Sequence, residues 1–261
     1  MTTDVEISVA DGVQTIRFAR PEKKNALNSP MYTAITEALK LGDASKDVVA
    51  HLFIGSGGTF TAGSDINEFL ERARGGTALD GPVLEFLRML PRVQKPMIAA
   101  VDGLGVGIGT TLLFHCDLVY TTPEARFITP FLNLGIVPEA GSSLLAPLRL
   151  GYARAFELLI LGEPLTAERA REAGLVNAIV PAAELESTAR QAAAKLAQKP
   201  QEALALARRL LRGDPGAVSV RIEEEAKLFK ERLSSPEARE AFTAFLEKRP
   251  PDFRKARAEA K

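Results

Sequence analysis

The pattern of apolar and polar residues predicts short strands and helices that alternate along the N-terminal part of the chain. Val5 to Val9 and Val13 to Phe18 flank the turn Asp11-Gly12 and are expected to form a hairpin. Ser29 and Pro30 predict the N-cap and first position of a helix that extends to about Leu41. Further apolar runs predict buried strands at Val48 to Ile54, Pro96 to Val101, Leu118 to Tyr120 and Leu175 to Val180, with helices at Asn67 to Arg74 and Thr110 to His115.

From about Gly141 onward the pattern becomes mainly helical. Tyr152 to Leu161 has apolar residues at helical spacing, and Thr166 is expected to cap another short helix. Four amphipathic helices follow, at Ala183 to Gln198, Pro200 to Arg212, Ala217 to Leu233 and Pro236 to Lys248. We therefore divide the chain into a core of residues 1–198 and a C-terminal helical region of residues 199–261. The pattern leaves open whether these helices cover a neighbouring copy or their own core.

Composition and charge describe an ordinary globular protein. The 261 residues are 46% hydrophobic and 25% charged, and 33 basic residues balance 33 acidic ones. No overall field is available to recruit nucleic acid or an anionic membrane. The only cysteine, Cys116, cannot form an intramolecular disulfide, and acids follow Met1 where a signal peptide would carry basic residues. We expect a cytoplasmic protein, without a transmembrane segment, because the most apolar window holds Asp102 and several glycines.

Glu139 is the one ionisable side chain between Arg126 and Arg149. A carboxylate in an apolar stretch loses hydration, which raises its proton affinity towards the range of a general acid or base. The alternative is structural: Pro138-Glu139-Ala140-Gly141 opens a helix, and the acid in its first turn interacts favourably with the helix dipole. The segment alone leaves both interpretations open.

Two glycine-rich loops each precede a predicted helix. Gly103 to Gly109 has glycine at every second position, which matches neither the dinucleotide fingerprint nor a phosphate-binding P-loop. Its backbone N–H groups either face a ligand or allow close packing of helix on strand. Thr61 to Ile66 is the second loop, in which Asp65 is expected to cap the following helix. The N–H groups of Ala62 and Ile108 could converge on one oxyanion.

The sequence offers few residues for nucleophilic catalysis, for metal binding or for phosphate binding. The chain has only His51 and His115 and no Gly-x-Ser-x-Gly motif, so a Ser-His-Asp triad is poorly supported. His115, Cys116 and Asp117 end an apolar helix and are assigned to packing, and no metal site is predicted. The adjacent Lys23 and Lys24 either bind phosphates or form a solvated loop.

Several motifs together resemble the crotonase (enoyl-CoA hydratase/isomerase) superfamily. They are Arg20-Pro21 with Asn25-Ala26-Leu27-Asn28, Phe60 to Asp65, Lys95 to Gly103, and Leu161-Gly162 with Ala173 to Val176, in the order in which that family has them. The resemblance implies an α/β fold in which a spiral of repeated ββα turns carries a C-terminal α-helical trimerisation region. It also implies a homotrimer or a dimer of trimers.

The resemblance further implies a coenzyme A thioester as substrate, with no separate cofactor. The thioester oxygen would accept hydrogen bonds from the N–H groups of Ala62 and Ile108, where an enolate charge develops. The expected substrate-binding residues are Lys24, Ala26, Ala62, Gly63, Ser64, Asp65, Ile66, Ile108, Phe131 and Ile136. For Phe131 and Ile136, core packing is the competing interpretation.

The two glutamates of family members that hydrate 2-enoyl-CoA are replaced by Thr111 and Phe131, neither of which exchanges protons near neutral pH. The run Leu134 to Ser143 instead resembles the delta-3,delta-2-enoyl-CoA isomerase branch, which has a single Glu after a Pro, here Glu139. We therefore expect an isomerase that moves a 3-enoyl-CoA double bond to the 2-position. The alternatives are a weak hydratase, an isomerase of ring-derived acyl-CoA, and a non-catalytic acyl-CoA-binding protein.

Overall fold

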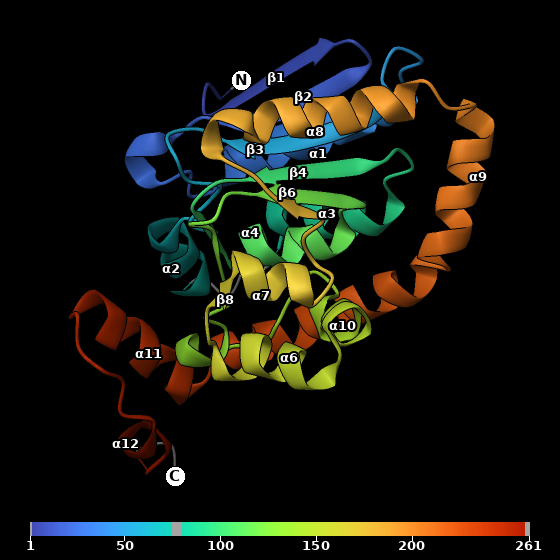
Figure 1. Cartoon of the computed structure of the whole chain (residues 1–261). Helices are drawn as coiled ribbons and strands as arrows, with labels where there is room; N and C mark the ends of the chain where they lie inside the picture. The colour runs from blue at the N-terminus through green and yellow to red at the C-terminus, as the bar shows by residue number, and fades with distance from the viewer. Residues whose placement is uncertain (1, 75–79, 259–261) are drawn as a thin grey trace.

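The computed structural model describes residues 2–74 and 80–258, and its main feature is a six-stranded sheet (Figure 1). The strand order is β1-β2-β3-β4-β6-β9, in which β1 and β2 are antiparallel and the other pairs are parallel. The strands are β1 (Val5–Ala10), β2 (Val13–Phe18), β3 (Ala50–Gly55), β4 (Met97–Val101), β6 (Leu118–Thr121) and β9 (Ala178–Ile179). Every residue of β4 is buried because a parallel strand is covered on both faces.

The chain enters a second, three-stranded sheet after β4 and again after β6. Its order is β5-β7-β8, formed by β5 (Leu104–Val106), β7 (Arg126–Ile128) and β8 (Leu165–Thr166). The chain runs from β4 into β5 and later from β6 into β7, and Thr61 after β3 forms a bridge to Gly105 beside them. Successive turns thus repeat a strand in one sheet, a strand or bridge in the other, and a helix. The predicted ββα spiral is confirmed.

The helices of the first part of the chain pack around the two sheets. They are α1 (Ser29–Ala44), α2 (Ile66–Arg74), α3 (Pro82–Met89), α4 (Ile108–Thr111), α5 (Ser142–Leu150), α6 (Tyr152–Phe156) and α7 (Ala167–Glu172). Short 3-10 turns at 21–23, 90–92, 112–115 and 132–134, and a π-helical turn at 157–161, complete these connections. The predicted helix from Tyr152 to Leu161 is therefore α6 continued by the π-helical turn.

Five helices end the part of the chain that the structure describes. They are α8 (Ala182–Ala197), α9 (Gln201–Arg212), α10 (Pro215–Leu233), α11 (Pro236–Leu246) and α12 (Phe253–Ala258). Figure 1 shows α8 across the six-stranded sheet, α9 standing apart at one side, and α11 and α12 at the opposite side. The boundary proposed at residue 198 falls between α8 and α9, and the division into a core and a helical region stays a prediction.

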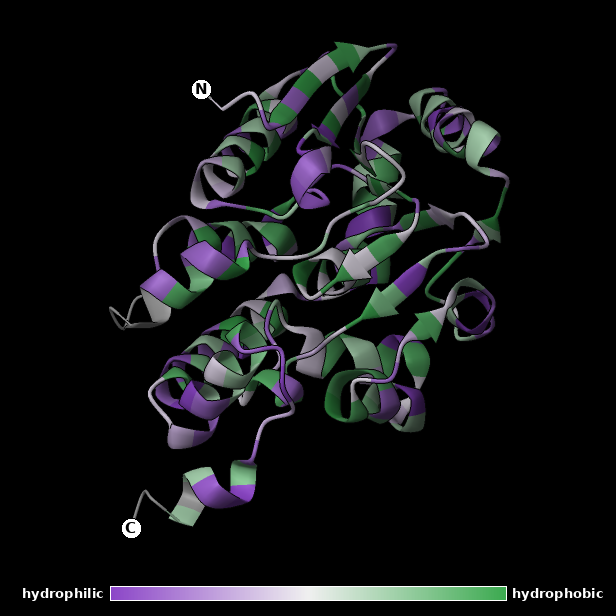
Figure 2. Ribbon diagram, turned by 90° about the vertical axis from the view of Figure 1, so that its left-hand side faces the viewer, coloured by the Kyte–Doolittle hydropathy of each residue, from purple (hydrophilic) through white to green (hydrophobic). Residues whose placement is uncertain are grey.

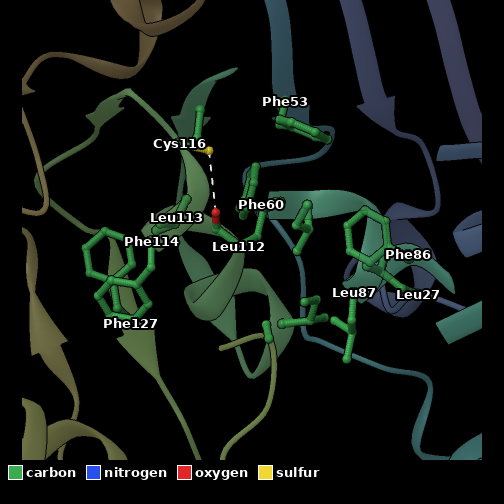
Figure 3. Packing of buried hydrophobic residues seen from close by; sticks show 14 of the residues in the cluster. Leu27, Phe53, Phe60, Phe86, Leu87, Leu112, Leu113, Phe114, Cys116 and Phe127 are labelled. Atoms are coloured by element: carbon green, nitrogen blue, oxygen red, sulfur yellow. Dashed lines mark hydrogen bonds between the residues drawn. The ribbon is translucent and has the colours of Figure 1, made fainter. Parts of the chain in front are cut away.

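Two hydrophobic clusters lie on opposite sides of the main sheet. The smaller joins Leu185, Ala189 and Ala193 of α8 to alternate residues of β3 and β4. The larger fills the space between the sheet and the other helices, and Figure 3 shows Phe53, Phe60 and Phe86 among its buried side chains. Hydrophilic and hydrophobic residues alternate along the helices (Figure 2), as expected when one face of a helix packs on the core. The larger cluster therefore anchors the loops that follow β3 and β4.

Details at helix ends and short strands differ from the sequence expectations. Asn28, and not Ser29, caps α1, because its side chain accepts a hydrogen bond from the Met31 N–H. Thr166 caps α7 as predicted, by accepting from the Arg169 N–H. The strands β5, β7 and β8 were not predicted, because runs of two or three residues carry too little periodicity to identify.

No helix of residues 2–74 or 80–258 is long and apolar enough to cross a bilayer.

Gly55 at the end of β3 offers a test of the close packing in the spiral. A Cβ atom there would lie 2.1 Å from the Thr59 carbonyl oxygen and 2.6 Å from that of Phe60. Because these are backbone atoms that cannot rotate away, Gly55→Ala should lower the free energy of unfolding by about 3 kcal/mol. Urea denaturation at one fixed protein concentration measures the change.

Gly174→Ala is the control for that substitution. Gly174 has a left-handed φ of 81° after α7, and the atom nearest its added Cβ is the Arg149 carbonyl oxygen at 3.8 Å, an ordinary contact, so only the backbone preference is lost, about 1 kcal/mol. An equal decrease in the free energy of unfolding for the two variants would contradict the packing argument.

Candidate active site

One cavity of about 560 Å³ lies where the two glycine-rich loops meet the C-terminal helices. Its walls are mainly apolar, and Glu139 is among the few acids that reach it. The loops contribute Ala62, Gly63, Ser64, Val106, Gly107 and Ile108. The C-terminal helices α10 and α11 contribute Phe229, Ala241 and Phe245, and α2 and α3 contribute Phe69 and Val83. A concave, largely apolar site with a few polar groups is the usual form of a small-molecule site.

The loop after β3 is held against the loop after β4 by backbone hydrogen bonds. The Thr61 N–H donates to the Leu104 carbonyl at 2.9 Å, and the Val106 N–H donates to the Thr61 carbonyl at 3.0 Å. The Thr61 hydroxyl also donates to the Asn25 carbonyl at 2.6 Å. These bonds fix the relative positions of the two loops.

The hydrogen bonds of these loops correct the assignment of Ala62 as an oxyanion donor. The Ala62 N–H donates to the Lys24 carbonyl at 2.9 Å and is therefore already used. The N–H groups of Ser64 and Ile108 have no acceptor among the residues that the structure describes, and both residues line the cavity. The pair available to bind an oxyanion is thus Ser64 with Ile108.

The carboxyl group of Glu139 is buried, with 6% of the residue exposed. Burial is the main cause that raises its pKa to about 8; a hydrogen bond from Thr111 opposes the rise, and the nearby charge of Glu225 adds to it. The Thr111 hydroxyl donates to Oε1 of Glu139 at 2.5 Å. No cation among the described residues contributes to this pKa, so the group is suited to gaining and losing a proton near neutral pH.

Glu139 lies in a turn and not in a helix. Ala140 and Gly141 have left-handed φ angles of 61° and 71°, and α5 begins only at Ser142. His115 donates from Nε2 to the Ala140 carbonyl at 2.7 Å. The alternative in which Glu139 belongs to the first turn of a helix is therefore wrong, and the turn places its side chain in the cavity wall.

Thr111 and Phe131 carry no exchangeable carboxyl group. Thr111 is fully buried and is bonded to Glu139, and Phe131 lines the cavity with 5% exposure. Glu139 lines the same cavity as Ser64 and Ile108 and supplies a buried carboxyl group there. Asp65 and Glu68 also border the cavity, but Asp65 is bonded to Arg20 at 2.7 Å and Glu68 accepts a hydrogen bond from the Ser29 N–H.

Comparison with known proteins agrees with this arrangement. A model of the enoyl-CoA hydratase/isomerase family matches residues 8–256. The chain belongs to this family. Its membership supports acyl-CoA isomerase or hydratase activity and confirms the crotonase-type fold.

Three similar proteins illustrate the range of the enoyl-CoA hydratase/isomerase family. The 1,2-epoxyphenylacetyl-CoA isomerase of Escherichia coli (strain K12) is 32% identical over 251 residues, covering 94% of this chain and 96% of that protein. Enoyl-CoA delta isomerase 2 of Rattus norvegicus is 35% identical over 245 residues, covering 92% of this chain and 62% of that protein. A crystal structure of an enoyl-CoA hydratase/isomerase from Pseudoalteromonas atlantica T6c superimposes with a TM-score of 0.91 at 35% identity, covering 96% and 100% of the two chains. The names of these three proteins describe different reactions.

Nearly all of the expected substrate-binding residues of this family member line the cavity. They are Ala26, Ala62, Gly63, Ser64, Asp65, Ile66, Ile108, Phe131 and Ile136. Lys24 does not line it: its side chain is exposed, its backbone is left-handed at a φ of 50°, and its carbonyl accepts from Ala62. Lys23 takes that place at the cavity wall. Asp65 caps α2 as predicted, by accepting from the Asn67 N–H at 3.1 Å.

The contribution of the C-terminal helices to the cavity was not predicted. Phe229 of α10 packs edge-on against Phe69 of α2, with ring centroids 6.0 Å apart, and Phe242 of α11 lies 5.5 Å from the same ring. Ala241, Phe245 and Arg249 also reach the cavity. The only sequence signal for these contacts was the aromatic residues on amphipathic helices, which identifies a buried face but not what it covers.

His115 and Cys116, just before β6, are buried in their neutral forms. Burial lowers the pKa of His115 to about 3 and raises the pKa of Cys116 to about 12, so neither an imidazolium nor a thiolate forms near neutral pH. The described part of the chain contains no cluster of His, Cys, Asp and Glu that could hold a metal ion.

The raised pKa of Glu139 should make Glu139→Gln more stabilising as the pH rises. A carboxyl group whose pKa is 4.5 when unfolded and about 8 when folded favours the folded state below pH 4.5 and loses that contribution as the pH rises through 8. Because each pKa unit corresponds to about 1.4 kcal/mol, the Gln variant should gain a few kcal/mol over wild type between pH 5 and pH 9. Urea denaturation at both pH values tests this, with the exposed Glu163→Gln as control. A pH-independent difference would contradict a buried, proton-binding Glu139.

Proposed function

We propose that the protein is an acyl-CoA isomerase that moves the double bond of a 3-enoyl-CoA to the 2-position. The observation that carries the proposal is one buried carboxyl group, Glu139, at a cavity that is also lined by Ser64 and Ile108, whose N–H groups have no acceptor among the described residues. Lys23 at the cavity wall is proposed, in place of Lys24, as a contact for the phosphates of coenzyme A. The coenzyme is part of the substrate, and no further cofactor is required.

In the proposed mechanism Glu139 acts first as a base and then as an acid. Its carboxylate takes a proton from C2, the electrons of that bond form a dienolate, and the negative charge develops on the thioester oxygen. The N–H groups of Ser64 and Ile108 donate to this oxygen, and one such donor typically contributes roughly 2.7–4 kcal/mol to transition-state stabilisation. Protonated Glu139 then delivers the proton to C4, which leaves the double bond between C2 and C3.

The surroundings of Glu139 favour isomerisation over hydration. Adding water across a double bond requires a group that activates the water and a group that protonates the carbon. Thr111 and Phe131 stand where the resemblance to the hydratases places the two acids. With a single proton carrier in an apolar wall, a shift of one proton within the substrate is the reaction best supported.

The direct test is Glu139→Gln, which keeps the shape of the side chain but replaces the carboxyl group by an amide that cannot transfer the proton. Isomerisation of 3-enoyl-CoA substrates to the conjugated 2-enoyl product should fall by about 10²- to 10⁴-fold. Glu163→Gln, which removes an exposed acid outside the cavity, should retain wild-type rates. Near wild-type isomerisation by the Glu139 variant would defeat the assignment.

Two other assays separate the proposed isomerase from a binding protein and from a hydratase. A binding protein would not catalyse exchange of the C2 hydrogen of a bound acyl-CoA with solvent deuterium, whereas the proposed enzyme would. Rapid hydration of crotonyl-CoA by the wild type would favour a hydratase. The screen should include ring-derived acyl-CoA substrates, because one relative is named as a 1,2-epoxyphenylacetyl-CoA isomerase.

We also propose that the protein assembles as a homotrimer or a dimer of trimers. Two groups of large apolar side chains are exposed: Leu148, Tyr152 and Leu161 near α6, and Leu210 and Leu211 at the end of α9. Leu210 and Leu211 are 81% and 89% exposed, which is unusual for neighbouring leucines on an isolated chain. Burial of these groups against other copies removes this surface from water.

Substituting both leucines of α9 should therefore disrupt assembly. A Leu210→Glu and Leu211→Glu double variant should sediment at a lower mass than wild type, because charge at a buried interface is unfavourable. Leu41→Glu, at a residue that is 69% exposed on α1, is the control and should leave the mass unchanged. A monomeric wild type, or an unchanged mass for the double variant, would refute the proposed role of α9.

A further inference from the structure

The turn that carries Glu139 lies directly under α10. A Cβ atom on Gly141 would come within 2.9 Å of Cγ1 of Val218, one turn of α10 before Ile222, so the helix leaves no room for a side chain there. Ala140, a residue with a Cβ, is held in the left-handed region at a φ of 61°. A backbone conformation of this kind persists only when its surroundings impose it. The contacts from α10 are therefore part of what shapes the turn.

Glu225 of α10 makes hydrogen bonds to the turn that carries Glu139. Its Oε2 accepts from the Gly141 N–H at 2.6 Å, and its Oε1 accepts from the Ser143 N–H at 2.9 Å and the Ser143 hydroxyl at 2.5 Å. Both carboxylate oxygens are thus used, in contacts that span more than 80 residues of sequence. Because all three partners donate hydrogen bonds, the carboxylate fits this position better than a neutral amide.

Glu225 also replaces a missing helix cap. The N-cap residue of α5 is Gly141, which has no side chain to accept from the first turn. The Glu225 carboxylate accepts from this turn and carries a negative charge at the helix N-terminus, where the helix dipole favours it. The start of α5, and with it the preceding turn, is fixed by a residue of the C-terminal helices.

The position of Glu225 has an electrostatic consequence for Glu139. Glu225 is only 4% exposed, and its negative charge raises the pKa of Glu139. The other groups that face the turn are Thr111, which donates to Glu139, His115, which donates to the Ala140 carbonyl, and Arg221, which donates to the Ser143 hydroxyl at 3.2 Å. Burial raises the pKa of Glu225, while the hydrogen bonds from Ser143 and Gly141 and the charge of Arg221 act in the opposite direction and favour its charged form.

We propose that Glu225 is a positioning residue for Glu139: it holds the Pro138-to-Ser143 turn through Gly141 and Ser143 and sets the charge beside the proton carrier. The proposal rests on the proposed function of Glu139 as the base. Glu225 itself is not among the residues that line the cavity. Its removal therefore affects the rate of proton transfer more than the binding of acyl-CoA.

Glu225→Gln tests the proposal. The Gln side chain has the same length, but its NH₂ group faces the donors of Gly141 or Ser143, so one end of the contact is lost together with the charge. The kcat for isomerisation should fall by about 10- to 100-fold, because a small displacement of a catalytic group has effects of this size. KM should change by less than about 3-fold.

The pH dependence separates positioning from general loss of structure. Glu139 must be ionised to take the C2 proton, so kcat/KM rises with pH through the pKa of Glu139. Losing the neighbouring negative charge lowers that pKa, and the rise in Glu225→Gln should occur at lower pH than in wild type. Carboxyl ¹³C NMR titration of Glu139, identified by its absence in Glu139→Gln, follows the same shift without substrate.

Matched variants complete the test. Glu225→Asp keeps the charge but shortens the side chain, so kcat should fall while the pH midpoint stays closer to that of wild type. Glu231→Gln removes an exposed acid from the same helix and should change neither quantity. Wild-type kcat and an unshifted Glu139 titration in Glu225→Gln would overturn the proposal, as would an equal shift in Glu231→Gln.

Two further outcomes are distinguishable. If Glu225→Gln does not fold, as judged by circular dichroism, then unchanged kcat in Glu225→Asp overturns the positioning role. If the wild type catalyses neither isomerisation nor C2 exchange, the proposed function of Glu139 fails and the positioning role in catalysis fails with it. In that case the NMR titration still decides whether Glu225 sets the pKa of Glu139.

Discussion

The burial of the Glu139 carboxyl group, with no cation beside it in the described part of the chain, is the constraint on which the rest of the site depends. An ionised carboxylate in such a place is unfavourable, and the protein responds by shifting its pKa upward to about 8. Among the described residues, the Thr111 hydroxyl is the hydrogen-bond partner of this carboxyl group. The resemblance to the hydratases places one of their two acids at Thr111, so that position contributes a hydrogen bond to Glu139 in place of a second carboxylate.

The spiral fold provides what this carboxyl group requires. Repeated passes between the two sheets bring the loop after β3 against the loop after β4, and their mutual hydrogen bonds leave the N–H groups of Ser64 and Ile108 pointing to no acceptor among the described residues. The C-terminal helices then close the apolar side of the cavity with Phe229 and Phe245. Glu225 on one of these helices connects the closing layer to the turn that holds Glu139.

Sequence reasoning identified the elements that depend on strong local signals. The hairpin, the buried strands of the main sheet and the four long C-terminal helices follow directly from periodicity, and Glu139 stood out because its neighbours are apolar. Motif resemblance supplied the spiral and the cavity residues. The donor assignment failed at Ala62 because which N–H group in a loop is already bonded depends on a distant carbonyl, here that of Lys24. Glu225 was missed for the same reason: its partners lie more than 80 residues away in the sequence.

The fate of a single hydrogen tests the central claim most directly. In one turnover of a 3-enoyl-CoA labelled with deuterium at C2 in ordinary water, a buried Glu139 that both removes and returns the proton should deliver a measurable fraction of the label to C4 of the product. Mass spectrometry and NMR of the product locate it. Label at C4 that disappears with Glu139→Gln is the result predicted. A product that carries only solvent hydrogen at C4, formed equally fast by wild type and by the Gln variant, would contradict the account.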